Sequence, residues 1–420
     1  MPPADVALTT KLYLRTAPAE SSRPAAVREA DREIALTVHD NLGAVEAEWL
    51  AFQEQADCTV FQTFEWLSTW QRHIGAREGD VPCIAVARDA EDRILCILPL
   101  AVRSLGFARE LTWLGAALCD YNAPLLAADF TARVDAAKFG DLWQGVLQLV
   151  ETQARLHFDL VRLEKMPPMV GTQPNPMLAL PTMPHPSGAY ATPLMADWDD
   201  FYAAKRSAST RRRDRSKRKR LAQYGEVKFV TSMSASGALD TLGVLIAQKS
   251  AVLARHGIAN FFTRPGYTAF FRDFASNPRS RRLAHAAELR VGDEIAAANL
   301  GLVFKGRYYY VLSSYTESEM AHWGPGAAHL HELMRYAIAH KCTVFDFTVG
   351  DEPYKRDWCE TVAPLSDHLS AMRWRGALMV PLLIAMMKLK REIKQSPLWW
   401  NLFSKVRSLT APHKPSRRTR

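Results

Sequence analysis

The sequence predicts an α/β protein of the α+β type, with two tandem units that each hold a mixed, mostly antiparallel sheet flanked by helices. The chain has 420 residues, 48% of them hydrophobic, which is enough for more than one ordinary domain. Helical periodicities and β-type alternations both occur throughout. The same order of elements occurs in both halves: helices, paired strands, a loop, a helix and a final strand. This repetition indicates duplication of one α/β unit.

The first half contains the elements of one such unit. We expect strands at 33–39, 82–88, 94–102, 109–114 and 158–166, and helices at 42–55, 63–74 and 134–153. The strands on either side of residues 89–92 form a hairpin. An aromatic stripe that begins at Phe61 and ends at Trp70 is predicted to be core.

The second half repeats this pattern with a three-stranded meander. We expect helices at 198–224, 237–255, 266–276 and 327–340, and strands at 226–230, 284–290, 294–304, 307–314, 344–349 and 369–374. Turns at Gly292-Asp293 and Lys305-Gly306 separate the meander strands.

Composition suggests five segments along the chain. They are a flexible Ala/Pro/Ser-rich leader (1–30), a first unit (31–166), a proline-rich crossing (167–197), a second unit (198–376), and a basic amphipathic helix with a tail (377–420). The leader has no apolar core of signal-peptide length, so we expect a cytoplasmic protein.

The net charge of +9 conceals two basic segments on an acidic body. Residues 205–220 hold ten Lys/Arg and one Asp, and residues 388–420 hold ten Lys/Arg and one Glu, so each carries +9. The remainder is 9 − 18 = −9, which excludes a general polyanion binder. Segment 205–220 is either a solvated helix or a contact for a phosphorylated acceptor, tRNA or an anionic membrane. It lacks the aromatic residues that stack on bases, which argues against binding of single-stranded nucleic acid.

The C-terminal segment allows two interpretations. Residues 377–409 combine an apolar run, basic residues and Trp399-Trp400. They form either a helix at the surface of an anionic membrane, or a terminal helix packed on the core. The run is about half of the roughly 20 residues that span a bilayer.

The cysteines and histidines point away from a metal site. The six cysteines are scattered in apolar runs without a C-x-x-C pair, which is typical of buried reduced thiols. We therefore expect no zinc or other metal.

A glycine turn opens the helix expected at 327–340. The letters Gly-Pro-Gly-Ala at 324–327 follow a strand, and small residues let a ligand approach the first N–H groups of a helix. An anionic group, such as a phosphate, would be favoured there. Alternatively, the glycines only turn the chain and Pro325 starts the helix.

Four stretches of the chain are informative together: FQTFEWLSTWQRHIG, LCDYNAPLL, GPGAAH and FDFTVGDEPYKRDW. They resemble the CelD-like acetyltransferases of the GNAT superfamily, and the resemblance covers about residues 30–375. This family is related to the FemAB peptidyltransferases, which pair two GNAT-like units. It implies two GNAT-like units and acetyl-coenzyme A as acyl donor, held at Gly324, Gly326 and Ala327. The family's coenzyme A loop usually begins with Gln or Arg, where this chain has Ala321.

The resemblance also implies site residues. The strand with Asp346 would separate from its neighbour at the catalytic site. There Asp346 would orient a hydrogen-bond donor such as Lys355, and Lys355 would bind a phosphate or an oxyanion. Tyr354 would protonate the leaving thiolate. Alternatively, Asp346 is a structural acid bonded to the following turn, and Lys355 is a solvated surface residue.

The resemblance further implies that the acceptor is bound by Asp120, Tyr121 and Tyr315. For Asp120, an Asx-type turn is the structural alternative.

We therefore expect an acyltransferase that moves an acetyl group to an amine or hydroxyl of a sugar or cell-envelope precursor, as in exopolysaccharide synthesis. The alternatives are an aminoacyl-tRNA-dependent peptidyltransferase and a non-catalytic polysaccharide-biosynthesis partner that kept the fold. Contact with the inner face of the cytoplasmic membrane would run through 205–220 and 377–420.

Overall fold

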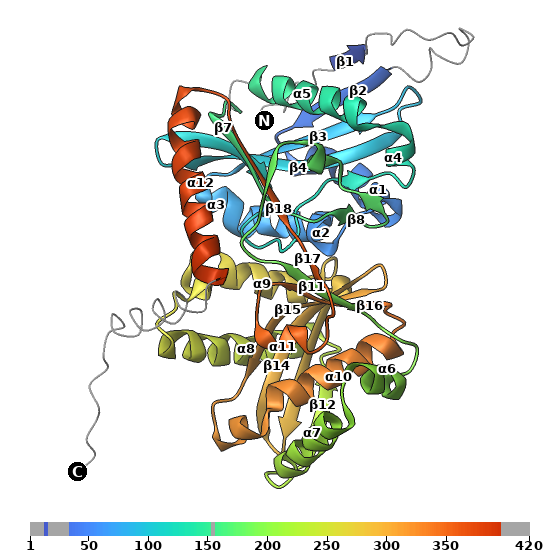
Figure 1. The fold of residues 1–420 in the computed structure, drawn as a ribbon, viewed down its shortest axis with the longest axis vertical. Helices are drawn as coiled ribbons and strands as arrows, with labels where there is room; N and C mark the ends of the chain where they lie inside the picture. Colours follow the sequence, from blue (N-terminus) through green and yellow to red (C-terminus); the bar gives the residue numbers. More distant parts are fainter. Residues whose placement is uncertain (1–11, 16–32, 153–155, 396–420) are drawn as a thin grey trace, which may run out of the picture. The chain divides into compact units, whose positions relative to one another are not determined.

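The computed structural model describes residues 12–15, 33–152 and 156–395, and it divides into two compact units (Figure 1). Unit 1 consists of the described residues up to Ala189 together with Val362–Ala385, and unit 2 consists of Tyr190–Thr361 and the described residues from Met386. The expected second unit ended at 376, whereas the chain returns to unit 1 at Val362. The reason is a strand pairing in the sheet of unit 1, given next.

Unit 1 is built on a nine-stranded sheet with the path β1-β2-β3-β4-β5-β7-β18-β10, and β6 pairs with β4. The strands are β1 (Leu12–Arg15), β2 (Glu33–His39), β3 (Val81–Arg88), β4 (Ile94–Leu105), β5 (Ala108–Trp113), β6 (Leu125–Leu126), β7 (Leu160–Met166), β10 (Thr182–Pro184) and β18 (Ser366–Ala371). The expected hairpin is confirmed, because β3 and β4 pair antiparallel. The strand expected at 369–374 lies at Ser366–Ala371, where it pairs antiparallel with β7.

The leader expected at 1–30 contains β1, which pairs antiparallel with β2. The rest of that segment lies outside the described residues, as do residues 396–420 with Trp399 and Trp400.

Helices accompany this sheet, and all of them except α3 bury apolar residues. They are α1 (Glu46–Gln55), α2 (Phe64–Trp70), α3 (Ala76–Glu78), α4 (Phe130–Arg133), α5 (Ala136–Thr152) and α12 (Trp374–Gln395). The aromatic stripe is core as expected, with Phe61 and Trp70 both buried. A short two-stranded sheet of β8 (Met169–Val170) and β9 (Gln173–Pro174) follows β7.

The strands of unit 2 belong to a seven-stranded sheet in the order β12-β13-β14-β15-β16-β11-β17, whose last strand, β17, is assigned to unit 1 by the division of the chain. The strands are β11 (Ala189–Pro193), β12 (Val227–Thr231), β13 (Ala284–Val291), β14 (Glu294–Phe304), β15 (Arg307–Tyr315), β16 (Val344–Val349) and β17 (Val362–Ala363). The expected meander is confirmed by the antiparallel pairs β13–β14 and β14–β15. The turns that join them hold Gly292 and Gly306, both with positive φ.

Two layers of helices enclose the sheet of unit 2. The helices are α6 (Trp198–Lys205), α7 (Ala208–Leu221), α8 (Ala235–Arg255), α9 (Tyr267–Ser276), α10 (Pro325–Ala339) and α11 (Pro353–Arg356). On β13, Glu288 bonds Thr241 of α8, and its neighbour Leu289 packs in the cluster that includes Ala328 of α10. Since successive residues of a strand point to opposite faces, α8 and α10 cover opposite sides.

The helix expected at 198–224 is two helices. Arg206 has extended φ and ψ, and the side chain of Ser207 accepts a hydrogen bond from the N–H of Thr210, so α7 begins with its own N-cap.

Both units share one arrangement, which confirms the expected fold class. In unit 1, β5 and β7 run parallel and α5 connects them; in unit 2, β15 and β16 run parallel and α10 connects them. All six cysteines are buried and free, as expected.

Helix α8 is the one described helix that is long and apolar enough to cross a bilayer. It packs against β13, β14 and β15 of unit 2.

Candidate functional site

The candidate site of unit 2 begins where β15 and β16 separate. The pairing between them consists of Arg307↔Val344, Tyr308↔Phe345 and Tyr309↔Asp346. Beyond these pairs, β15 continues to Tyr315 and β16 to Val349 without pairing to each other. Backbone groups on the facing edges are therefore available to other partners. This is the separation that the resemblance implies for the strand with Asp346.

The carboxylate of Asp346 is fully buried and secures the end of β16. It accepts a hydrogen bond of 2.8 Å from Nη1 of Arg307 and one of 2.8 Å from the N–H of Thr348. Thr348 has φ of 61°, a costly conformation for a β-branched residue, which the carboxylate helps to hold. These contacts suit the structural alternative for Asp346; its catalytic role stays a prediction.

Lys355 is buried beside the separated strands, with 3% of its surface exposed. Its Nζ donates to the carbonyl of Val349 at 3.1 Å and pairs with Glu352 at 2.9 Å. The alternative of a solvated surface lysine is therefore wrong. Burial would raise the pKa of Glu352, but the nearby charge of Lys355 and its hydrogen bond outweigh burial and lower that pKa.

Tyr354 precedes this lysine on α11 and its ring contacts Phe347 of β16, with centroids 6.1 Å apart. Burial, with Tyr310 and Glu352 nearby, raises the pKa of the Tyr354 hydroxyl. The hydroxyl therefore stays protonated at neutral pH, as a proton donor must.

Lys249 of α8 is a site residue that sequence reasoning missed. Its Nζ donates to the carbonyl of Ser313, on the part of β15 that has left β16, at 3.2 Å. Burial lowers the pKa of Lys249, whereas the charge of Glu352 raises it and that of Lys355 lowers it. The signal was the polar pair Gln248-Lys249, which interrupts an apolar helix.

The glycine turn lies at the start of α10, next to the end of β15. Gly324 is the N-cap residue with φ of 69°, Pro325 follows at the first helical position, and no side chain caps the helix. A Cβ on Gly326 would lie 3.2 Å from Cδ1 of Tyr315. The structure thus brings together Tyr315, Gly324 and Gly326, and Ala327 lines the same turn.

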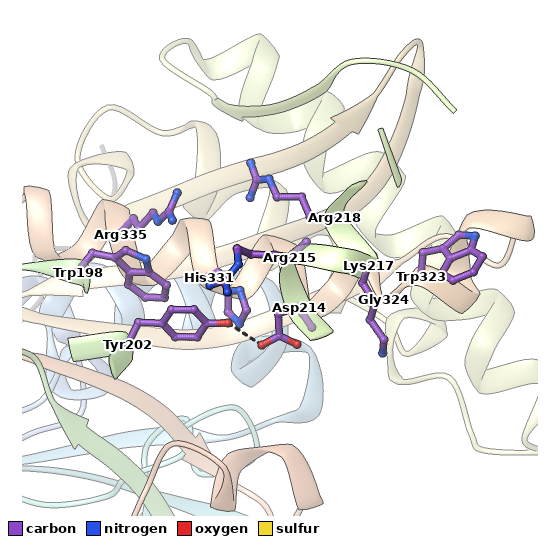
Figure 2. Close-up of a pocket in the computed structure, with 12 residues that line it drawn as sticks. Trp198, Tyr202, Asp214, Arg215, Lys217, Arg218, Trp323, Gly324, His331 and Arg335 are labelled. Atoms are coloured by element: carbon purple, nitrogen blue, oxygen red, sulfur yellow. Dashed lines mark hydrogen bonds between the residues drawn. The ribbon is translucent and has the colours of Figure 1, made fainter. Parts of the chain in front are cut away.

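A pocket of about 80 Å³ adjoins this turn, between α10 and helices α6 and α7 (Figure 2). Its lining is aromatic and basic: Trp198, Tyr202, Asp214, Arg215, Lys217, Arg218, Trp323, Gly324, Ala327, Ala328, His331 and Arg335. A Cβ on Gly324 would lie 3.9 Å from Nζ of Lys217. Basic segment 205–220 therefore reaches the glycine turn.

The charges around the pocket are only partly paired. Arg218 pairs with Glu332 of α10, and Tyr202 donates to Asp214 at 2.6 Å. Among the described residues, Arg215 and Lys217 have neither an ion pair nor a hydrogen bond. Two cations next to an uncapped helix start attract an anion.

Two buried groups complete the pocket. Burial lowers the pKa of His331 to about 4, so its imidazole is neutral at pH 7. Within the described chain, the indole Nε1 of Trp198 is buried without a hydrogen-bond partner. An unpaired buried donor is costly, and a ligand atom in the pocket is one way to satisfy it.

In unit 1 the corresponding gap is filled by its own chain. Strands β5 and β7 pair only at Glu110↔Leu160 and Leu111↔Val161. Beyond these pairs, Asn122 donates to the carbonyls of Glu164 and Lys165, and Nζ of Lys165 donates to the carbonyl of Cys119 at 2.7 Å. The gap in unit 1 is thus closed to a donor, which directs attention to unit 2.

Asp120 and Tyr121 lie on the loop that fills this gap. Tyr121 is buried with its ring against Phe61, and its carbonyl accepts from Gln62. Asp120 is half-buried. Both residues belong to unit 1, whereas the other predicted site residues belong to unit 2; their substrate-binding role stays a prediction.

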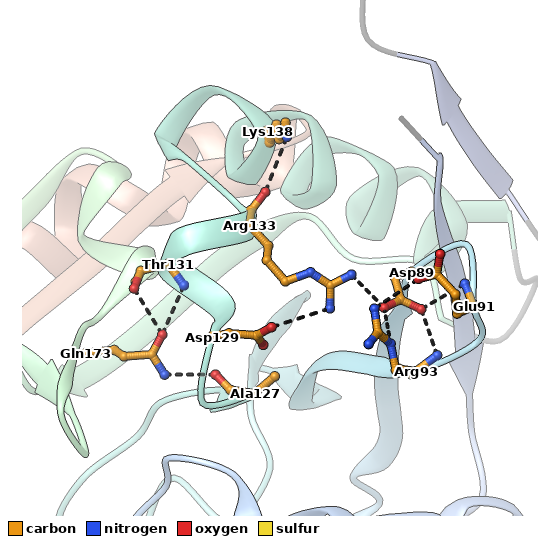
Figure 3. Close-up of polar contacts among 9 residues, drawn as sticks. All are labelled: Asp89, Glu91, Arg93, Ala127, Asp129, Thr131, Arg133, Lys138 and Gln173. Carbon is orange, nitrogen blue, oxygen red and sulfur yellow. Dashed lines mark hydrogen bonds and ion pairs between the residues drawn. The ribbon is translucent and has the colours of Figure 1, made fainter. Parts of the chain in front are cut away.

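Unit 1 also has a cavity of about 460 Å³ at the β3–β4 hairpin. Figure 3 shows two of its arginines, Arg93 and Arg133, bonded to Asp89. Asp89 accepts hydrogen bonds from Arg93 at 2.8 Å and from Arg133 at 2.6 Å, and Arg88 pairs with Glu48. Each arginine at this cavity is paired with a carboxylate.

A search for metal sites found no cluster of three His, Cys, Asp or Glu side chains within the described residues.

Comparison with protein families places the candidate site within one domain. Residues 208–356 match the model of the acetyltransferase (GNAT) domain, which is less than half of the chain. This match contains α7, the glycine turn, Asp346 and Lys355. No curated protein matches the chain significantly.

Comparison with solved structures supports the fold of most of the chain. The crystal structure of FemX is similar at a TM-score of 0.54 with 11% identity, covering 78% of this chain and 96% of FemX. A conserved protein of unknown function from Bacteroides thetaiotaomicron scores 0.49 at 11% identity, covering 80% and 99%. L-PGS from Bacillus licheniformis scores 0.47 at 12% identity, covering 83% and 97%. We use the FemX match alone, as evidence for the fold.

Proposed function

We propose, starting from the GNAT acetyltransferase domain at residues 208–356, that unit 2 transfers an acetyl group from acetyl-coenzyme A to an amine or hydroxyl. The observation that carries the proposal is the gap between β15 and β16, which opens beside an uncapped helix start and the unpaired cation of Lys217. The gap between β15 and β16 can thus hold the chain that carries the acyl group, and the adjacent start of α10 can hold an anion.

The residues present fit this donor. Its diphosphate would lie at the N–H groups of Gly326 and Ala327, with Lys217 in place of the polar Gln or Arg side chain that the family usually has where this chain has Ala321. The pantetheine arm would follow the edge of β15 that does not pair with β16 toward Ser313, whose carbonyl Lys249 bonds.

The chemistry requires positioning, loss of a proton from the acceptor, and stabilisation of a developing oxyanion. The ammonium of Lys355 supplies positive charge at the end of β16, where it already holds the carbonyl of Val349. The protonated Tyr354 hydroxyl is a proton source for the leaving thiolate. Lys249, whose pKa is lowered, is a candidate to take the proton of the acceptor.

The acceptor class in this proposal is a sugar or a cell-envelope precursor, as for CelD-like enzymes of polysaccharide synthesis. Tyr315 supports it, since its ring is 48% exposed beside the glycine turn and aromatic rings suit sugar faces. We assign the protein to the cytoplasm, where acetyl-coenzyme A is made.

Calorimetric titration of the full chain with coenzyme A tests the donor. We expect binding that Lys217→Ala weakens by roughly five- to tenfold, as for loss of one phosphate contact. The matched control is Lys219→Ala, because Lys219 is exposed on α7 outside the pocket lining. Absence of binding to the parent protein, or equal affinity in both variants, would contradict the assignment.

An aminoacyl-tRNA-dependent peptidyltransferase is the second candidate. The basic face of α7 beside the glycine turn favours it, and the fold resembles that of FemX. Competition separates the candidates: displacement of bound coenzyme A by tRNA, together with transfer from aminoacyl-tRNA, would replace our first proposal. Binding of neither donor would favour a non-catalytic partner in polysaccharide synthesis that kept the fold.

A further inference from the structure

The outer side of α12 carries a line of exposed apolar side chains. Their exposed fractions are 68% for Trp374, 63% for Leu378, 56% for Leu382, 58% for Met386 and 61% for Leu389. Spacings of three and four residues place them on one side of the helix. We name these five residues the α12 stripe.

The opposite side of α12 is also apolar, and it packs on unit 1. Leu383 is buried in a cluster with Ala108 of β5 and Leu160 of β7. The stripe is therefore not needed to attach the helix. A helix that is apolar on all sides is normally buried or in contact with lipid, and this one exposes five large apolar side chains to solvent.

Basic residues border the stripe. Between 373 and 392 the basic residues are Arg373, Arg375, Lys388, Lys390 and Arg391, and the only acid is Glu392, so the net charge is 5 − 1 = +4. Arg375 and Lys388 are exposed, and the helical repeat places them on either side of the stripe. A partner that matches an apolar stripe with basic borders has an apolar interior and an anionic surface. A second copy of α12 would bring like charges together.

We propose that α12 docks on the surface of a bilayer that contains anionic lipid, with the α12 stripe at the boundary between headgroups and acyl chains. Trp374 begins the stripe, and tryptophan favours the headgroup level. The arginine and lysine side chains at the borders meet lipid phosphates. The helix lies on the bilayer and does not cross it, because charged residues bracket the apolar run and Pro381 interrupts it. This inference is independent of the proposed function.

Vesicle sedimentation of the full chain tests it. We expect binding to vesicles of phosphatidylcholine with about one-third phosphatidylglycerol, and little to phosphatidylcholine alone. Raising the salt from about 0.05 M to about 0.5 M should reduce binding several-fold. The double substitution Leu378→Ser with Leu382→Ser should weaken it by roughly tenfold or more. The matched control is Met233→Ser, which removes an apolar side chain that is 84% exposed in unit 2.

A polarity-sensitive dye on Leu378→Cys reports on the stripe itself, because the native cysteines are buried. We expect its emission to shift to the blue when anionic vesicles are added, and no shift for the same dye on Ala137→Cys, an exposed position of α5.

Three results would overturn the proposal. The first is failure of the parent chain to bind anionic vesicles, and the second is equal binding by the double variant, which would place the contact elsewhere. A blue emission before vesicles are added would mean that the stripe is already covered. If that blue emission changes with protein concentration, a second copy of the chain covers the stripe. If it does not change, residues of the same chain, such as 396–420, cover it.

Discussion

Lys249, which is partly buried, and Lys355, which is buried, lie on different helices, and both amines interact electrostatically with the carboxylate of Glu352. They also bond the two strands that separate, at Ser313 of β15 and Val349 of β16. Both amines thus hold backbone carbonyls where β15 and β16 no longer pair with each other. A donor entering the gap would have to exchange hydrogen bonds with these amines.

Replacement of Lys355 by Met should affect both stability and turnover. The substitution leaves Glu352 and the carbonyl of Val349 without their partner, so we expect a loss of about 1–3 kcal/mol in the free energy of unfolding of unit 2. Turnover, measured as thiol release from acetyl-coenzyme A, should fall roughly a hundredfold. Lys228→Met, at a 59% exposed lysine, is the control. Normal turnover per folded molecule would show that Lys355 acts in stability alone.

Asp80 makes the stability of unit 1 depend on pH. Burial raises its pKa from 3.8 to about 6, so the folded state binds more protons than the unfolded state between these values. Stability is therefore lost as pH rises from about 4 to about 6, and the penalty persists at higher pH. Asp80→Asn should stabilise unit 1 at pH 7.5 by about 1–2 kcal/mol and leave it unchanged near pH 3.5.

Hydrogen exchange of amides in β3 and β4 measures this effect. Asp92→Asn is the control, because its side chain is 80% exposed. Equal stabilisation of the Asp80 variant at both pH values would contradict the cause we assign.

Among the elements, α12 depends on one glycine for its position. A Cβ on Gly376 would lie 2.0 Å from the carbonyl oxygen of Asp159, which accepts hydrogen bonds from the N–H groups of Met372 and Arg373. The start of the helix therefore lies directly against the backbone of unit 1. Deleting residues 377–420 would remove Leu383 from the core and destabilise this unit. Point substitutions therefore test the role of α12 better than such a deletion.

Gly376→Ala should displace the start of α12 and lower the stability of unit 1 by about 1–3 kcal/mol, despite the better helix propensity of alanine. Gly140→Ala in α5 is a matched control, since a Cβ there meets nothing within 4 Å. That substitution should stabilise by up to about 1 kcal/mol. Thermal denaturation of both variants measures the contrast; a stabilised Gly376 variant would mean that α12 is not held at this contact.

The sequence predicted elements well where local chemistry determines them. The meander of unit 2 follows from its turns at Gly292 and Gly306, which both require positive φ. It did not predict the partner of β18, whose short polar sequence pairs with a strand about 200 residues earlier in the chain, and no local pattern encodes such a distance. Of the site, the turn and Lys355 could be found from motifs. Lys249 could not, because its role arises only from packing against β15.

At the scale of the whole molecule, Asp367 ties the end of the chain to unit 1. This buried carboxylate on β18 accepts from the N–H of Lys165 at 2.8 Å and from His185 at 2.9 Å. Asp367→Ala should cost unit 1 about 3 kcal/mol. Asp367→Asn keeps an acceptor for Lys165 and should cost less. Denaturation that leaves unit 1 unaffected by Asp367→Ala would show that β18 is dispensable.

The position of β18 between β7 and β10 has a consequence for synthesis of the protein. A ribosome makes β7 and then all of Tyr190–Thr361 before it reaches Ser366. During that interval the nascent chain presents an unpaired strand edge at β7, which invites pairing with other chains. The first unit to be translated is therefore the second to be completed. Chaperones that shield strand edges should matter more for this protein during translation than after release.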